Sequence, residues 1–143
     1  MINNHIKYNH GVNWTSKFVG VPFIDGGRDI RGVDCYGLVY LVYREVLGIE
    51  LPGYGEISAH DMARASHRIR TDSAMAPWVP VTGPAQAMDV LVMRGRPLHV
   101  GVMVDAGHVL HVEAATASVI VPVDRSPQVR WRRLSLHRHE ALA

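Results

Sequence analysis

The chain has 143 residues, of which 48% are hydrophobic and 20% charged, so it is long enough for one domain with a substantial core and too short for two ordinary domains. Its 15 lysines and arginines against 13 aspartates and glutamates give a formal charge of +2, too balanced for a dedicated nucleic-acid-binding protein. A single cysteine excludes an intramolecular disulfide and a cysteine-based zinc site, and no apolar run reaches the roughly 18 residues of a membrane-spanning helix.

The sequence predicts one domain over residues 14–136, preceded by a polar lead-in at 1–13 and followed by a C-terminal tail at 137–143. The first residues lack a basic cluster followed by an apolar stretch, so no secretion signal is predicted. We therefore expect synthesis in the cytoplasm, where a single thiol stays reduced. A substrate outside the cell would then require another route of delivery.

The first half of the domain is predicted to be a loop followed by helices. Turn-forming residues fill 20–28, which predicts a loop. A helix is predicted over 35–47, with Asp34 as its N-cap and Gly48 as the left-handed residue after its end. Apolar residues on nearly every face indicate that this helix is buried. A second helix is predicted to begin near Ser58.

After a predicted loop at 77–84 the apolar residues alternate with a period of two, which is typical of β-strands. The predicted strands are 89–93, 98–104, 108–113, 118–123 and 129–134. A hairpin loop at 105–107 is predicted to join two of them. Helices followed by a meander of strands indicate an α+β domain with an antiparallel sheet.

Cys35 lies at the predicted start of the buried helix. A helix N-terminus presents unpaired N–H groups and a partial positive charge. Both favour a thiolate and lower a cysteine pKa from about 8.5 into the range of roughly 3.5–7.5. The same N–H groups are suited to an oxyanion. Cys35 is therefore a candidate nucleophile, and the alternative is a small buried core residue.

A cysteine nucleophile needs a base, and the chain has nine histidines. Those in the terminal segments are predicted to lie at the surface, namely His5, His10, His137 and His139. His60 and His67 share one face of the second predicted helix, with no third metal ligand in evidence. His99 and His111 differ from the others because each interrupts an apolar strand.

The predicted hairpin brings these two histidines together. A three-residue loop would pair Val104 with His108, and therefore Gly101 with His111. His99 and His111 would then share one face, in diagonal positions about 7–8 Å apart. Gly101 would remove a side chain where the two imidazoles would otherwise be crowded. This arrangement fits a base, His99, oriented by a second ring, His111.

Two other interpretations of the histidines remain open. Either ring is compatible with a partly buried side chain that is simply hydrogen-bonded. A metal site formed by His99, His108 and His111 is also conceivable, although His108 has the opposite strand parity and only Glu113 offers a nearby carboxylate.

Four blocks of sequence together resemble a known family. They are Phe18 to Gly27, Gly32-Val-Asp-Cys-Tyr-Gly-Leu-Val39, His99-Val-Gly-Val-Met-Val104 and Leu110-His-Val112. In order and spacing they resemble the NlpC family of papain-like cell-wall cysteine peptidases. The resemblance implies a papain-like α+β fold, in which a cysteine-bearing helix packs on an antiparallel sheet that carries the histidines. It also implies that Cys35 is the nucleophile, His99 the general base and His111 the residue that orients it.

The resemblance carries an expected activity. The family hydrolyses peptide bonds in peptidoglycan stem peptides, commonly between D-γ-glutamyl and diaminopimelate residues, through an acyl-enzyme and without a cofactor or metal. The fuller pattern from Trp14 to Leu38, including Gly26-Gly-Arg-Asp29, is most similar to the bacteriophage or prophage tail-associated branch. That branch implies delivery to the cell wall as a virion component, with phage tail proteins as partners.

The resemblance also suggests residues that contact substrate. Asp34 is a candidate for binding a free amine of a stem peptide, as its equivalent does in parts of the family, although its role as an N-cap is an alternative. Arg28 and Arg31 are candidates for binding substrate carboxylates, and solvated arginines are the alternative.

Phe23 departs from the family pattern. Many members have Tyr-x-Trp-Gly-Gly where this chain has Phe23-Ile-Asp-Gly-Gly27, and that tyrosine helps to bind the reacting carbonyl. Losing one oxyanion donor lowers a rate by roughly a hundred- to a thousandfold. The departure favours one alternative function, a non-catalytic tail-assembly or wall-binding module. A thiol-dependent amidase or acyltransferase is another.

Overall fold

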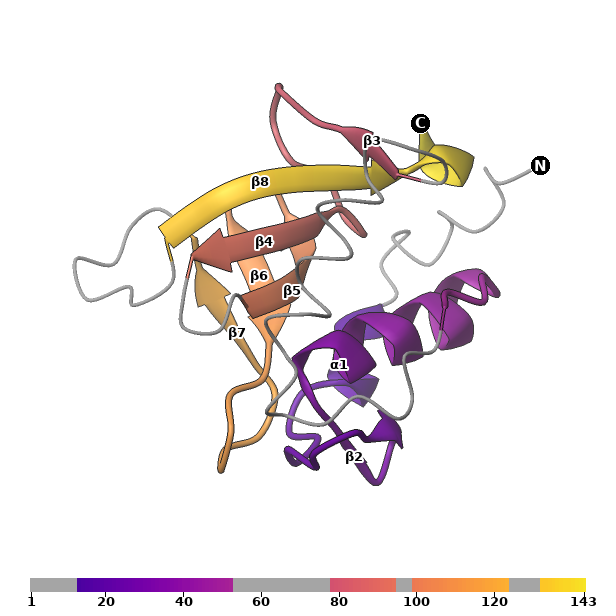
Figure 1. Cartoon of the computed structure of the whole chain (residues 1–143), viewed down its shortest axis with the longest axis vertical. Helices are drawn as coiled ribbons and strands as arrows, with labels where there is room; N and C mark the ends of the chain where they lie inside the picture. Colours follow the sequence, from indigo (N-terminus) through magenta and orange to yellow (C-terminus); the bar gives the residue numbers. More distant parts are fainter. Residues whose placement is uncertain (1–12, 53–77, 95–98, 124–131) are drawn as a thin grey trace.

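The computed structural model of the chain describes residues 13–52, 78–94, 99–123 and 132–143. Its main feature is a six-stranded antiparallel sheet with one helix, α1 (Cys35–Val42), on one side (Figure 1). The helix packs against β5 (His99–Asp105). The predicted α+β class, with the cysteine-bearing helix on an antiparallel sheet, is therefore confirmed.

The strands of the sheet lie in the order β3-β8-β4-β5-β6-β7. Their bounds are β3 Trp78–Pro80, β4 Val90–Arg94, β5 His99–Asp105, β6 His108–His111, β7 Val119–Pro122 and β8 Arg132–His139. The first four predicted strands correspond to β4, β5, β6 and β7. The last predicted strand, 129–134, ends too early, because β8 continues to His139 before a short 3₁₀ helix, η5 (Glu140–Leu142).

The prediction of a loop throughout 77–84 was wrong, because β3 lies within it. Trp78 pairs with His139 and Pro80 pairs with His137, so β3 is an edge strand on the last part of β8. Proline is tolerated at a sheet edge, where its missing N–H leaves no ladder bond unmade. The pairing joins segments far apart in the chain, which local sequence patterns do not reveal.

The helix predicted over 35–47 is confirmed, with a change of winding. Asp34 caps α1 by accepting a hydrogen bond from the Gly37 N–H, and the turns after Val42 form a π-helix, η3 (Tyr43–Leu47). The helix ends at Gly48 in the left-handed conformation, with φ of 68°. The second predicted helix, with His60 and His67, lies outside the described residues. Within the described ranges, no helix has the length and apolar character needed to cross a membrane.

The segment before α1 wraps around its N-terminal end. It contains a 3₁₀ helix, η2 (Trp14–Lys17), and a two-stranded hairpin of β1 (Arg28–Asp29) and β2 (Gly32–Val33). The predicted loop over 20–28 is largely irregular. It approaches α1 so closely that a Cβ on Gly37 would lie 2.0 Å from the Gly27 carbonyl oxygen. Glycine at position 37 therefore allows the loop to pack against the first turn of the helix.

The core lies on both faces of β4. Val90 and Val92 pack with the α1 side chains, and Leu91 and Met93 pack with a second cluster that includes Leu136. Burial on both faces explains why β4 is a continuous apolar run rather than an alternating one. It also places the neighbouring end of β5, where His99 lies, in a buried environment.

Candidate active site

The N-terminal end of α1 meets the beginning of β5 at Cys35. Cys35 is the first residue of α1 and only 2% exposed. Its sulfur accepts hydrogen bonds from the backbone N–H groups of Val100 and Tyr36. Because Val100 directly follows His99, this contact brings the thiol to the part of the sheet that carries the predicted base.

The prediction of a lowered Cys35 pKa was wrong for the protein without substrate. Burial is the largest effect and raises the pKa of the thiol to about 12. The Val100 N–H lowers this pKa, the Asp34 carboxylate raises it further, and the Tyr36 N–H and the Arg28 charge lower it. Removal from water therefore outweighs the helix N-terminus. At neutral pH the sulfur is held as a thiol.

His99 and His111 lie side by side, as predicted. The Nε2 atom of His99 is 2.8 Å from the Nδ1 atom of His111, and the two rings meet edge to face at an interplanar angle of 81°. Both side chains are buried. Burial lowers the pKa of His111, an effect that the Glu113 charge partly opposes, so His111 is held neutral. A neutral imidazole has one nitrogen that accepts a hydrogen bond and one that donates.

The register of β5 and β6 explains this contact. Val102 pairs with Leu110 and Met103 with Val109, the register that the predicted three-residue loop requires. At the end of the hairpin the prediction was wrong, because Asp105 rather than Val104 lies opposite His108, through a bulge. The bulge absorbs one residue and leaves the register of the strands unchanged.

Gly101 lies opposite tightly packed atoms of β6, although these are not the imidazole rings of the prediction. A Cβ at this position would lie 2.7 Å from Val109 Cγ2, 2.8 Å from the Leu110 carbonyl oxygen and 3.1 Å from His111 Cβ. A side chain at position 101 would therefore force β5 and β6 apart next to the histidine pair.

Asp34 is fully buried beside Cys35, and its N-cap role is confirmed. One carboxylate oxygen accepts from the Gly37 N–H at 2.7 Å and from Arg28 Nη1 at 2.9 Å. The other accepts from the Gly26 N–H at 3.0 Å. In this arrangement both oxygens are engaged with protein donors, and binding of a substrate amine by Asp34 stays a prediction.

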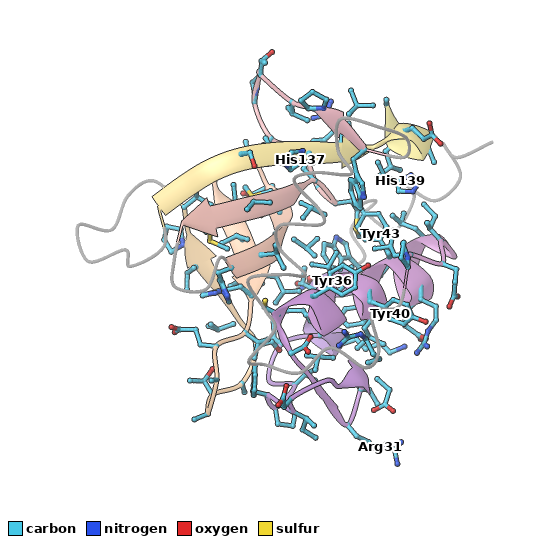
Figure 2. The ribbon with its side chains drawn as sticks, viewed as in Figure 1. Arg31, Tyr36, Tyr40, Tyr43, His137 and His139 are labelled. Atoms are coloured by element: carbon cyan, nitrogen blue, oxygen red, sulfur yellow. The ribbon has the colours of Figure 1, made fainter. Side chains whose placement is uncertain are left out.

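The other predicted substrate contacts lie in different environments. Arg28 is mostly buried, with its guanidinium against Asp34 and 5.4 Å from the centre of the Tyr36 ring. Arg31 is 85% exposed in the turn between β1 and β2, pairs with Asp29 and points away from the domain (Figure 2). Phe23 is half-buried and packs against the core. The structure thus brings Arg28, but not Arg31, to the surroundings of Cys35.

Two histidines predicted to lie at the surface are buried in the sheet. His137 and His139 are 4% and 9% exposed, and both lie on β8 (Figure 2). His139 packs edge to face on Trp78 and beside Tyr43. The surface prediction was wrong for both. Local sequence held little signal for this burial, because Leu136 and Arg138, which share the other face of β8, have opposite polarity.

His108 stands apart from the histidine pair. Its side chain is exposed, and its Nδ1 atom lies 2.9 Å from Oδ1 of Asp105. Among the residues that the structure describes, no group of three or more histidine, cysteine, aspartate or glutamate side chains is arranged to hold a metal ion.

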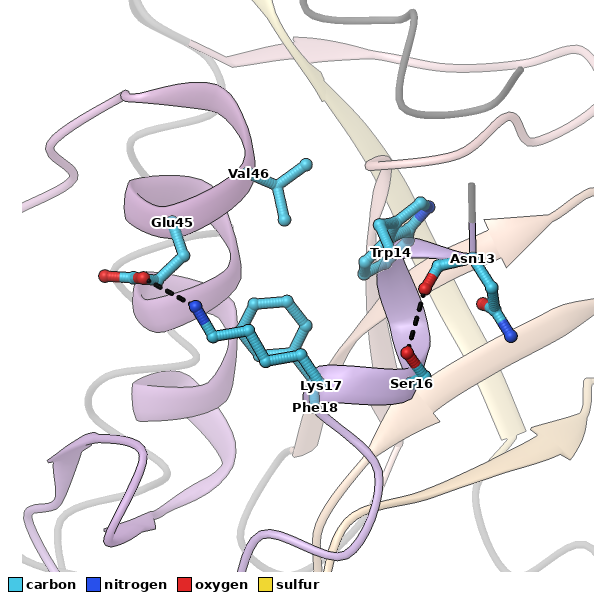
Figure 3. Close-up of a pocket in the computed structure, with 7 residues that line it drawn as sticks. All are labelled: Asn13, Trp14, Ser16, Lys17, Phe18, Glu45 and Val46. Atoms are coloured by element: carbon cyan, nitrogen blue, oxygen red, sulfur yellow. Dashed lines mark hydrogen bonds and ion pairs between the residues drawn. The ribbon is translucent and has the colours of Figure 1, made fainter. Parts of the chain in front are cut away.

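A cavity of about 300 Å³ lies between η2 and η3 (Figure 3). It is lined by Asn13, Trp14, Ser16, Lys17, Phe18, Glu45 and Val46. Lys17 and Glu45 form an ion pair of 3.0 Å at the cavity, so each charge is already neutralised by the other. None of the predicted site residues lines this cavity.

The fold and the site define a papain-like α+β domain in which a helix-borne cysteine meets a histidine-bearing sheet. The NlpC/P60 family model matches residues 20–135, and the chain belongs to the NlpC/P60 family. The NlpC/p60 domain of the peptidoglycan hydrolase SagA has the same fold, with a TM-score of 0.60 and 22% identity over 87% of this chain and 92% of that one. An NLP/P60 lipoprotein-like protein from Staphylococcus aureus subsp. aureus Mu50 has a TM-score of 0.61 and 17% identity, over 97% of this chain and 42% of that one.

One curated protein is similar over a shorter stretch. The gamma-DL-glutamyl hydrolase of Bacillus subtilis (strain 168) is 44% identical over 46 residues, which are 32% of this chain and 11% of that protein. The chain therefore matches only a small part of this relative.

Proposed function

We propose that this chain is a cysteine peptidase that hydrolyses peptide bonds in peptidoglycan stem peptides, with Cys35, His99 and His111 as its catalytic residues. The observation that carries the proposal is the 2.8 Å contact between His99 Nε2 and His111 Nδ1, next to the strand residue whose N–H contacts the Cys35 sulfur. Membership of the NlpC/P60 family supports the same assignment.

In the proposed mechanism His99 acts on the thiol through Nδ1, because its Nε2 atom faces His111. The proposed mechanism uses the tautomers in which neutral His111 accepts at Nδ1 and His99 donates through Nε2. His99 then takes the proton of Cys35 at Nδ1. The positive charge that develops on His99 is stabilised by the same Nε2–H···Nδ1 bond. His111 thus has the role of the orienting member of a triad.

The high pKa of Cys35 favours proton transfer during attack over a preformed thiolate. As the sulfur bonds to the substrate carbonyl carbon, its proton moves to His99, and the carbonyl oxygen becomes an oxyanion. In this mechanism the Cys35 backbone N–H, at the start of α1, stabilises that oxyanion. The C–N bond then breaks, and the amine leaves with the proton from His99, giving a thioester on Cys35.

In the hydrolysis of the thioester, His99 acts first as a base toward water and then as an acid toward the sulfur. His99 takes a proton from water, the hydroxide oxygen bonds to the thioester carbonyl carbon, and the C–S bond breaks. The thiolate recovers its proton from His99, and the acyl product leaves as a carboxylic acid that ionises in solution. Phe23 has no hydroxyl and takes no part in binding the oxyanion, so a modest maximal rate is expected.

The proposed bond joins D-γ-glutamyl and diaminopimelate residues of the stem peptide. The similarity to part of a gamma-DL-glutamyl hydrolase supports a γ-glutamyl bond. The test is incubation of purified muropeptides with the wild-type chain and with Cys35→Ala, followed by mass spectrometry of the products. Cleavage at this bond by the wild type alone supports the proposal, and intact muropeptides in both reactions contradict it.

We also propose that the protein acts as a phage or prophage tail component that reaches the cell wall with the particle, with tail proteins as partners. The sequence pattern from Trp14 to Leu38 supports this placement. Mass spectrometry of purified particles tests it. Detection of the chain in the tail fraction is expected, and its absence from particles whose other tail proteins are detected would contradict it.

The burial of Cys35 and the phenyl ring at position 23 favour a second candidate, a non-catalytic tail-assembly or wall-binding module. That candidate predicts binding to intact sacculi without any released peptide, and equal binding by Cys35→Ala. A thiol amidase or acyltransferase would instead turn over a different substrate and release no shortened stem peptides.

A further inference from the structure

Arg28 joins three features next to Cys35. Its Nη1 atom donates to the Gly27 carbonyl oxygen at 2.8 Å and to Asp34 Oδ1 at 2.9 Å. Its guanidinium also lies over the ring of Tyr36, the residue after the cysteine. A single mostly buried side chain therefore connects the loop before the β1–β2 hairpin, the N-cap of α1 and the first turn of α1.

The contact between Arg28 and Asp34 matters for Cys35 because Asp34 carries a buried negative charge. The Asp34 side chain has no exposed surface, so water does not screen its negative charge. It is adjacent in sequence to Cys35, where a negative charge opposes formation of a thiolate. Two charged side chains act on the thiol, Asp34 at the N-cap and Arg28 from β1. His99 of β5 directly precedes Val100, whose N–H contacts the sulfur.

We propose that Arg28 is a positioning residue for catalysis: it compensates the buried charge of Asp34 and holds the Gly26–Gly27 loop, so that a negative sulfur can form on Cys35. This inference rests on the proposed role of Cys35 as nucleophile. In this proposal Arg28 works through its contacts with Gly27, Asp34 and the Tyr36 ring. It acts through Asp34, which is the helix cap and the buried charge closest in sequence to the nucleophile.

The test is the rate of Cys35 alkylation by iodoacetamide against pH, measured on the folded chain. The assay needs no peptide substrate, so it stays informative if the proposed hydrolysis is not observed. The variants are Arg28→Met, which removes the charge, and Arg28→Lys, which retains it. Arg138→Met is the matched control because Arg138 pairs with another fully buried carboxylate, Asp89, at 2.8 Å.

We expect Arg28→Met to slow alkylation at pH 8 by about tenfold, which corresponds to about one unit in the thiol pKa. Arg28→Lys should stay within about threefold of wild type, because the positive charge is retained. Arg138→Met should leave the pH profile unchanged. An unchanged profile for Arg28→Met, or an equal slowing by Arg138→Met, would overturn the proposal.

A second pair of variants covers the case in which Arg28→Met does not fold. Asp34→Asn keeps an N-capping side chain and removes the buried charge. The double variant Asp34→Asn/Arg28→Met then contains no unpaired buried charge. Equal alkylation rates in the double variant and in Asp34→Asn, both no slower than wild type, support compensation of Asp34 by Arg28, and slower alkylation in the double variant than in Asp34→Asn contradicts it.

Discussion

The two ends of the helical segment Cys35–Leu47 are built from similar parts and differ in what those parts surround. At the N-terminal end, buried Asp34 pairs with Arg28, and at the η3 end buried Asp89 pairs with Arg138. Buried histidines also lie near each end, His99 with His111 at the first and His139 beside Tyr43 at the second.

The two ends differ in the side chains that these polar groups lie beside. At the N-terminal end the polar groups surround a cysteine at the first turn of α1, where helix N–H groups are unpaired. At the η3 end His139 packs on the aromatic side chains of Tyr43 and Trp78, whose ring centroids are 5.8 Å apart. Buried ion pairs and histidines are therefore not by themselves signs of an active site. A nucleophile among backbone donors is the distinguishing feature.

The largest loss of hydrolysis that separates the two ends of the helix is expected at Cys35. Cys35→Ala removes the proposed nucleophile and is expected to lower stem-peptide hydrolysis by about 10⁴-fold or more. The melting temperature, followed by circular dichroism, should change little because the side chain is small. Retained hydrolysis in a folded Cys35→Ala protein would sink the proposed mechanism.

The second-largest effect is expected at His99, with His139 at the η3 end as the residue for comparison. His99→Ala is expected to lower the hydrolysis rate by roughly 10²- to 10⁴-fold, because it removes the proposed general base. His139→Ala should keep the rate and lower the melting temperature, since an edge-to-face contact of this kind contributes about 0.5–1.5 kcal/mol. Equal loss of activity in both variants would break the distinction between the two ends.

The ion pair at the η3 end is expected to matter for stability alone. Arg138→Met leaves the buried Asp89 carboxylate without its cation and should lower the free energy of unfolding by about 3 kcal/mol, measured by urea titration. Activity per folded molecule should be unchanged. The control is Arg31→Met, which breaks an exposed pair and should not move the urea midpoint. A loss of activity in folded Arg138→Met would show that the two ends are coupled.

A matched pair of glycine substitutions tests the strand contact beneath the histidines. Gly101→Ala places a Cβ against Val109, Leu110 and His111, and is expected to lower stability by about 1–3 kcal/mol and to reduce activity. Gly107→Ala meets no atom within 4 Å and should be tolerated. Urea titration and the hydrolysis assay report the two effects. Equal tolerance of both substitutions would contradict the close approach of β5 and β6.

The smallest expected effect is on pH dependence. Burial lowers the pKa of His111 and of His139 from an ordinary value of 6.5, so each binds a proton more readily in the unfolded chain. Stability therefore rises with pH where the unfolded state holds more protons, and it falls as the pH drops below about 6.5. Urea titrations at pH 5 and pH 7.5 check this. His139→Gln should reduce the difference, and an unchanged difference would contradict the assignment to His139.

Local sequence patterns were sufficient for much of the site. The apolar run after Asp34 predicted a capped, buried helix, and two histidines interrupting neighbouring strands predicted a contact across a hairpin. Each depends on spacing within a few residues or across one short loop, where helix and strand geometry are periodic. The exact pairing at the hairpin end was missed because a bulge changes the loop without changing the register.

The features that the sequence did not reveal depend on partners far away in the chain. β3 pairs with the edge that β8 offers, His139 is buried against Tyr43 of η3 and Trp78 of β3, and His137 lies between β3 and β4. The compensation of Asp34 by Arg28 likewise depends on the loop folding back on the helix. No local period encodes such contacts.

The sequence by itself determined the helix with its cap, most strands, the pairing of His99 with His111 and the need for glycine at position 101. Only the tertiary structure decided the charge state of the thiol. Position at a helix N-terminus favours a thiolate, but packing α1 on β5 removes Cys35 from water and raises its pKa to about 12. Desolvation depends on every element around the group, so it is determined by the assembled fold rather than by neighbours in the chain.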